Sequence, residues 1–227
     1  MKNTKTGILS FIAISALIIS GTVKTDAQSF ELGARFLPTF TALDIKTSEG
    51  GTIKGEATLG YGIGGVIGFN FNKHVGVQAE VIYNSLSQEY KENNNVRKVK
   101  LNYVNIPLLL SLNTNRAAPV NFNLVVGPQI GINVGSDFES SSNDGTVTQT
   151  AILSVKKGDL GFAYGAGVDF GLIPSGAFRV GFGFRGVYGL LDISDRSKTT
   201  TTDSYYLLDR THVKSYAAYV GLSFLIM

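Results

Sequence analysis

The sequence predicts an all-β protein: an eight-stranded antiparallel up-and-down transmembrane β-barrel that follows a cleaved N-terminal signal peptide. Three observations lead to this prediction. Apolar residues alternate with glycines and polar residues in eight segments, short and long connections alternate between these segments, and the first 27 residues have the composition of an export signal. Since successive side chains of a strand point to opposite faces, each segment presents one apolar face and one small or polar face.

Residues 1–27 are predicted to be the signal peptide. Lys2 and Lys5 precede an apolar run that is shorter than the roughly 20 residues of a transmembrane helix, and small residues lead to a cleavage site between Ala27 and Gln28. Cleavage leaves residues 28–227 as one barrel domain. It also removes three lysines and one aspartate, so the formal charge of +3 falls to +1, and the basic composition is no argument for nucleic-acid binding. The chain has no cysteine, which excludes disulfides and thiolate sites.

The clearest alternation lies in the hairpin formed by residues 159–170 and 178–190. In both arms the even positions are almost all apolar, whereas the odd ones are mostly glycine with a few charged residues. A face that met water would carry many lysine, glutamate, threonine and serine residues. Glycine with sparse charge instead suits a crowded interior, so we predict that the apolar face points outward to lipid.

Six further segments of the chain repeat this alternation. They are 29–41, 57–71, 75–89, 99–113, 120–135 and 213–226. The connections 72–74, 114–119 and 171–177 are short, whereas the others are longer and polar, the longest being 136–158 and 192–212. Short turns at one end and long loops at the other are typical of outer-membrane barrels, whose closure leaves no sheet edge in hydrocarbon.

Aromatic residues form two rows on the predicted outward face, one at the short-turn ends of the strands and one near the long-loop ends. The first row is Phe30, Phe71, Phe122, Phe170, Phe178 and Phe224, and the second is Phe40, Tyr61, Tyr83, Tyr188 and Tyr216. Two aromatic belts are expected at the two interfaces of a bilayer. The rows therefore support the same orientation of the strands.

Four segments carry a resemblance to a known family. They are LNYVNIPLLLSL (101–112), VVGPQIGINVG (125–135), DLGFAYGAGVDF (159–170) and SYAAYVGLSFLIM (215–227). They resemble the outer-membrane β-barrel family of Bacteroidetes, often labelled porin family or PorT-like, among small barrels of the OmpA/OmpX type. The resemblance implies a location in the cell outer membrane. Relatives often carry glutamate just before the IPLLL run, where this chain has Asn105.

The predicted inward face holds three acidic and three basic side chains. These are Glu31, Glu80 and Asp169, and Arg35, Arg179 and Arg185. The interior of an eight-stranded barrel is only wide enough for side chains, and unpaired buried charges are costly. We therefore predict a salt-bridged plug, with a charged constriction for ions or a proton path as the alternative.

No catalytic, cofactor-binding or metal-binding residue is predicted. Neither His74 nor His212 has a nearby carboxylate pattern or a second ligand at metal spacing, and the glycine-rich run 60–65 lies inside an alternating segment instead of before a helix.

The predicted function is that of a non-enzymatic integral outer-membrane barrel with a structural or interaction role; the alternative is a small pore or transport protein. The expected partners are outer-membrane lipid, the outer-membrane assembly machinery, and an extracellular ligand or protein that would contact loops 136–158 and 192–212. These two loops are polar and rich in serine, threonine and aspartate, and the simpler interpretation of both is a mobile solvated surface.

Overall fold

The computed structural model describes residues 28–42, 44–46, 52–54, 58–92, 95–142, 147–149, 157–173, 176–190 and 214–226. The strands are β1 (Ser29–Ala42), β2 (Asp44–Lys46), β3 (Thr52–Lys54), β4 (Thr58–Asn70), β5 (Val75–Glu92), β6 (Asn95–Asn113), β7 (Val120–Ser142), β8 (Val147–Gln149), β9 (Gly158–Gly171), β10 (Phe178–Gly189) and β11 (Lys214–Ile226). Within these ranges there is no helix of the length and hydropathy needed to cross a membrane. The predicted signal peptide up to Ala27 and the predicted loop 192–212 lie outside the described residues.

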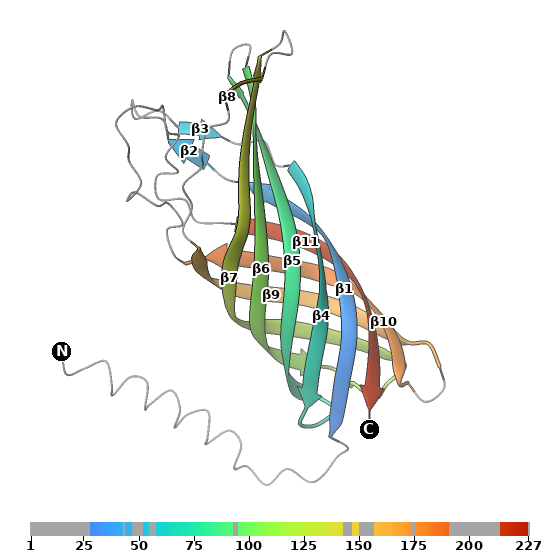
Figure 1. The fold of residues 1–227 in the computed structure, drawn as a ribbon. Helices are drawn as coiled ribbons and strands as arrows, with labels where there is room; N and C mark the ends of the chain where they lie inside the picture. Colours follow the sequence, from blue (N-terminus) through green and yellow to red (C-terminus); the bar gives the residue numbers. More distant parts are fainter. Residues whose placement is uncertain are drawn as a thin grey trace, which may run out of the picture.

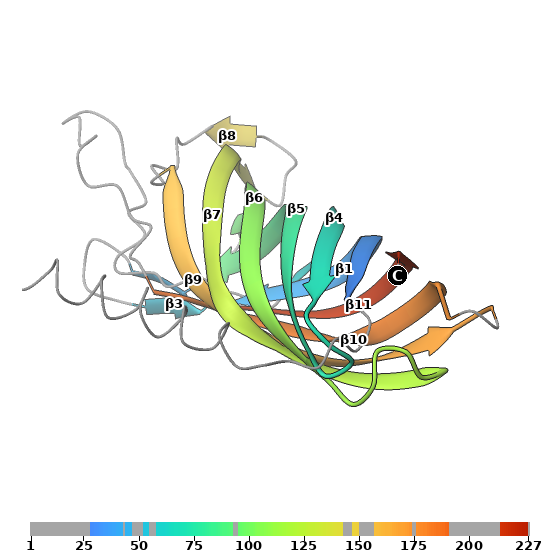
Figure 2. The same ribbon diagram turned by 90° about the horizontal axis from the view of Figure 1, so that it is seen from below.

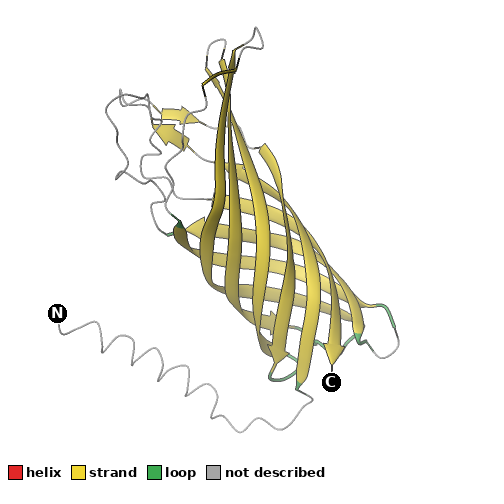
Figure 3. Cartoon of the chain, viewed as in Figure 1, coloured by secondary structure: helices red, strands yellow, loops and turns green. Residues whose placement is uncertain are grey.

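Eight of the strands close into an antiparallel barrel (Figures 1 and 3). Around the wall the order is β1, β4, β5, β6, β7, β9, β10 and β11, and β11 pairs with β1 to complete the ring. Phe30 lies opposite Ile226 at one end of this closing seam and Ala42 lies opposite Lys214 at the other. From below, β4 to β7 curve around one side of the barrel and β1, β10 and β11 around the other (Figure 2). The predicted fold is confirmed.

The two faces of the wall have the predicted orientation. On β6, the side chain of Leu108 is 58% exposed and points outward, whereas that of its neighbour Leu109 is 1% exposed and points inward. Both predicted aromatic rows lie on the outer face, although Phe71 and Phe178 are half-buried there. The interior is correspondingly polar, and one of its fully buried side chains is that of Arg179.

The short connections join at one end of the barrel, which we call the short-turn end. The backbone N–H of Arg116 donates to the carbonyl of Lys73 (2.8 Å), and that of Gly171 donates to the carbonyl of Pro119 (2.8 Å). These two bonds link the connection 114–119 to the connection 72–74 and to the end of β9. The C-terminal end of β11 lies at the same end (Figure 1).

At the opposite end, β5, β6 and β7 rise beyond the rest of the wall (Figure 1). The sequence predicted a strand that ends at residue 135 and a loop at 136–158, and this boundary was wrong. β7 continues to Ser142, where it pairs with Asn95 of β6, and β8 pairs with Ser140 and Ser141. The polar segment after residue 135 has no apolar alternation, so its strand conformation comes from the neighbouring strand β6, whose backbone supplies the hydrogen-bond partners.

Glycines of the inner face make room for a large aromatic side chain. A Cβ atom at Gly183 would lie 2.6 Å from Cε1 of Tyr219, and one at Gly167 would lie 2.0 Å from its hydroxyl oxygen. The Tyr219 side chain therefore lies against β10 and β9 in space that only glycine leaves free. Tyr219 also joins an apolar interior cluster with Leu37 and Ile82.

Candidate functional site

The six predicted interior charges all face the inside of the barrel, and they form two groups. The Glu80 group consists of Glu80, Arg35, Arg185 and Gln78, and the Asp169 group consists of Asp169, Glu31, Arg116, Arg179, Asn121 and Asn123. Each group combines charges from strands that are far apart in the sequence. The closure of the barrel is therefore what brings the groups together.

The Glu80 group crosses the barrel axis. Arg185 on β10 donates to Glu80 on β5 through Nη2 to Oε1 (2.9 Å) and through Nη1 to Oε2 (3.3 Å). In the strand order, β5 and β10 are four strands apart in either direction, so they stand on opposite sides of the ring. Arg35 on β1 and Gln78 also donate to Oε1 of Glu80. One carboxylate thus receives two guanidinium groups.

The Asp169 group lies nearer the short-turn end. Asp169 on β9 accepts a hydrogen bond from Nε of Arg179, and its Oδ2 accepts from Nδ2 of Asn121 (2.9 Å) and of Asn123 (3.2 Å). Arg179 also donates from Nη2 to the carbonyl of Ala118 (2.9 Å) in the connection between β6 and β7. The group therefore ties the barrel wall to one of the short turns.

Arg116 is a functional residue that sequence reasoning missed. It lies in the short connection 114–119, and its guanidinium enters the barrel, where Nη1 donates to Oδ2 of Asp169 (2.5 Å) and Nη2 pairs with Glu31 on β1. Burial lowers the pKa of Arg116, but the Glu31 and Asp169 carboxylates raise it by more, so the net shift is upward and the group stays charged. The alternation of residues along a strand cannot show whether a side chain in a turn enters the barrel. The sequence does offer one sign of such a role, because Arg116 is the only arginine in the three short connections.

Tyr219 is the second missed residue. Its odd position on β11 gives it the inward parity, although it is not among the six predicted interior residues. The guanidinium carbon of Arg35 lies 4.8 Å from the centroid of the Tyr219 ring, a cation–π contact. Tyr219 therefore helps to hold Arg35 beside Glu80.

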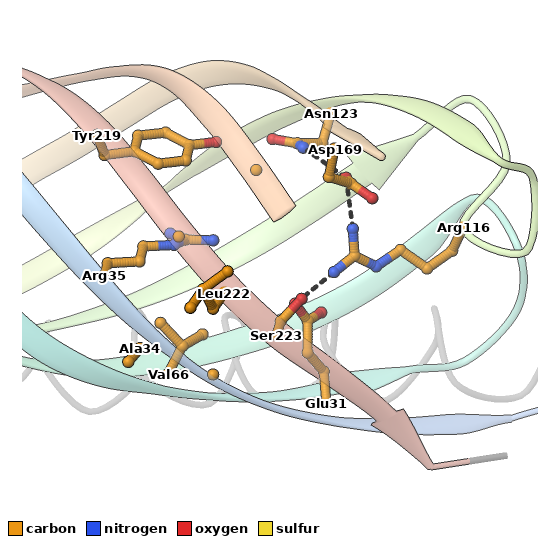
Figure 4. A pocket seen from close by; sticks show the side chains of 13 residues that line it. Glu31, Ala34, Arg35, Val66, Arg116, Asn123, Asp169, Tyr219, Leu222 and Ser223 are labelled. Carbon is orange, nitrogen blue, oxygen red and sulfur yellow. Dashed lines mark hydrogen bonds and ion pairs between the residues drawn. The ribbon is translucent and has the colours of Figure 1, made fainter. Parts of the chain in front are cut away.

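A small cavity separates the two groups (Figure 4). Its volume is about 30 Å³, room for one or two water molecules. The polar residues that line it are Glu31, Arg35, Arg116, Asn123, Asp169, Tyr219 and Ser223. In Figure 4 the guanidinium groups of Arg35 and Arg116 extend toward each other from opposite sides of this space.

The two histidines lie apart from these groups. His74 is exposed in the turn between β4 and β5, where its Nδ1 is 3.3 Å from the carbonyl oxygen of Asn113. His212 lies outside the described residues. Among the residues that are described, there is no group of three histidine, aspartate or glutamate side chains that could hold a metal ion.

Three solved structures illustrate the similarity of this barrel to known proteins. The outer membrane protein OprG from Pseudomonas aeruginosa is 13% identical, with a TM-score of 0.51 over 88% of this chain and 96% of that chain. The attachment invasion locus protein Ail of Yersinia pestis, in complex with the heparin analogue sucrose octasulfate, is 15% identical (TM-score 0.41; 86% and 99%). The outer membrane protease OmpT from Escherichia coli is 10% identical (TM-score 0.46; 91% and 99%). At these identities the likeness concerns the fold and not the function.

A family comparison gives the more direct result. No curated protein sequence matches the chain. The family described as outer membrane protein beta-barrel domain matches residues 26–195, which include seven of the eight barrel strands. The chain therefore belongs to this outer-membrane β-barrel family, and it is an outer-membrane protein.

Proposed function

We propose that this protein is a non-enzymatic outer-membrane barrel whose interior is closed by ion pairs and whose long-loop end has an interaction role. The observation that carries the proposal is the ion pair between Arg185 and Glu80, because it joins opposite sides of the ring. The interior of an eight-stranded barrel is about filled by side chains, whereas open aqueous channels belong to barrels of roughly 16 strands.

The Asp169 group supports the same proposal at a second level of the barrel. A solute that passed the Glu80 group would next meet Arg116, which is held between Glu31 and Asp169. A path through both levels would have to separate buried ion pairs, which leaves charges without partners in a medium of low dielectric constant. Because the carboxylates of Glu31, Glu80 and Asp169 are each engaged by arginine and enclosed by the wall, the arrangement favours a structural role over catalysis.

The interaction role rests on the shape of the long-loop end. β5, β6 and β7 are longer than the other barrel strands and extend past them, away from the short-turn end. In outer-membrane barrels the short turns face the periplasm and the long loops face the exterior. The extension formed by β5, β6 and β7 would therefore stand outside the cell, where it could contact an extracellular ligand or protein. Insertion of the barrel into the membrane would require the outer-membrane assembly machinery as a further partner.

Conductance in planar bilayers tests the closed interior. We expect the purified wild-type protein to show no steady open conductance, and we expect Arg185→Ala to admit small ions, because it removes the side chain that crosses the axis. Gly65→Ala on the outer face serves as the matched control and should stay closed. A large, stable conductance of the wild-type protein would instead favour the alternative, a small pore or transport protein.

Two further measurements test the rest of the proposal. Mass spectrometry of the protein from outer membranes should find an N-terminus at or within a few residues of Gln28, and an intact residue 1 would contradict the signal peptide. Crosslinking of whole cells followed by recovery of the barrel should capture a partner through the extension. If deletion of residues 137–142 leaves the captured set unchanged, the interaction role of this extension is wrong.

A further inference from the structure

The two charged groups contain one positive charge more than they contain negative charges. Four arginines (Arg35, Arg116, Arg179 and Arg185) pair with three carboxylates (Glu31, Glu80 and Asp169). All seven side chains lie inside a wall whose outer face is apolar. A charge that lacks a partner in such surroundings is strongly destabilising, so the excess charge calls for a counter-ion.

The excess charge lies in the Glu80 group. In the Asp169 group two arginines meet two carboxylates, whereas in the Glu80 group Arg35 and Arg185 share a single carboxylate. Arg185 makes two hydrogen bonds to Glu80, whereas among the described residues Arg35 donates to Glu80 from Nη1 alone. A guanidinium has five N–H donors, so Arg35 keeps donors for another acceptor.

The cavity between the two groups adjoins Arg35. Neutral donors line it as well, in the side chains of Asn123, Tyr219 and Ser223. The carboxylates of Glu31 and Asp169 also reach the cavity, but Arg116 pairs with both of them on its far side (Figure 4). The end of the cavity next to Arg35 is therefore its electropositive end.

We propose that this cavity binds one small monovalent anion, a halide such as chloride, beside Arg35. A cavity of about 30 Å³ has room for an ion of roughly the size of a water molecule and excludes polyatomic organic anions. The bound anion balances the one excess positive charge of the two groups. This site does not depend on the proposed function, because a bound ion needs no open path through the barrel.

Salt-dependent unfolding of the full-length mature protein in detergent micelles tests the site. The urea midpoint is measured with increasing sodium chloride or bromide, with sodium gluconate making up a constant ionic strength. Since a ligand that binds only the folded state stabilises it, the midpoint should rise with halide concentration and then saturate. If gluconate and halide give the same midpoint throughout, the cavity holds water alone and the proposal is wrong.

Two glycine-to-alanine variants test whether the halide effect on the urea midpoint arises at this cavity, and neither variant changes a charge. A Cβ atom at Gly181 would meet Cβ of Asp169 at 3.5 Å and the carbonyl of Val168 at 3.8 Å, so Gly181→Ala fits the fold while its methyl group takes space from the cavity that Gly181 lines. We expect this variant to lose the preference for halide over gluconate. The matched control Gly65→Ala, on the outer face, should keep it. A full halide effect in Gly181→Ala would overturn the proposal.

A charge variant and a crystal complete the test. Arg35→Gln removes the excess positive charge, so its urea midpoint should no longer depend on halide, and an unchanged dependence would contradict the role of Arg35. Crystals of the wild-type protein grown in bromide should show an anomalous peak between Arg35 and Arg116. The absence of a peak there would also overturn the proposal, whatever the behaviour of the Arg35 variant.

Discussion

The outer and inner faces of this barrel are built on the same strands, yet they obey opposite rules. Leu108 and Leu109 are chain neighbours of the same residue type, and one is 58% exposed while the other is 1% exposed. On the outer face, large apolar side chains stay exposed because the surrounding solvent is lipid. On the inner face, arginine and glutamate are buried because each has charged partners. The comparison shows that what a face contacts, lipid outside and paired charges inside, decides which side chains are stable there. The degree of burial alone does not.

The largest effect is expected at the centre of the inner face. Glu80→Gln leaves Arg35 and Arg185 without their carboxylate, and breaking a buried ion pair costs about 3–5 kcal/mol. The free energy of unfolding in urea measures the loss. Glu80→Asp, which keeps the charge, should lose less. A Glu80→Gln variant as stable as the wild-type protein would mean that the interior charges are solvated and not paired.

The same substitution on both faces sharpens the comparison. Leu109 packs against Val125 and Ala163 inside the barrel, so Leu109→Ala leaves a cavity and should cost about 2–5 kcal/mol. Leu108 faces lipid, and lipid chains can fill the space that Leu108→Ala leaves. The loss in free energy of unfolding should therefore be clearly smaller for Leu108→Ala than for Leu109→Ala. Urea unfolding of the two variants side by side decides the matter. Equal costs would contradict the difference between the faces.

A charge on the outer face tests the lipid boundary. Leu108 lies midway along the part of β6 next to the short turns, and Leu108→Arg should cost about 2–4 kcal/mol if that part spans the bilayer. Leu59, near the outer end of β4, is expected at the interface, where Leu59→Arg should cost about 0–1 kcal/mol. Refolding yields into lipid vesicles provide the measurement. A similar cost at both positions would place the bilayer boundary elsewhere.

The smallest effects concern two glycines that differ in their surroundings. A Cβ atom at Gly183 on the inner face would lie 2.4 Å from the carbonyl oxygen of Ala166, so Gly183→Ala should cost about 1–3 kcal/mol through overpacking. Gly158 has no atom within 4 Å of such a Cβ, and Gly158→Ala should stay within about 0.5 kcal/mol of the wild-type protein. Thermal unfolding of both variants checks that Gly183→Ala loses more stability than Gly158→Ala. A loss at Gly158→Ala as large as that at Gly183→Ala would refute the prediction.

The sequence by itself determined the number of barrel strands and the face on which each side chain lies. Both follow from a period of two residues, which is a local property of an extended chain and needs no knowledge of the neighbouring strand. Parity alone separates Leu108 from Leu109, and it gives the six predicted charged residues their inward face. Parity also gives Tyr219 its inward position.

Only the tertiary structure decided which interior charges meet. Glu80 pairs with Arg185 because closure of the ring puts β5 opposite β10. Arg116 pairs with Glu31 and Asp169 because its turn, between β6 and β7, lies beside β9 and across the short-turn end from β1. β7 likewise extends to Ser142 because β6 runs beside it and completes its hydrogen bonds. Contacts of this kind depend on strand order and register around a closed wall, and no local pattern of residues encodes the distance across a barrel.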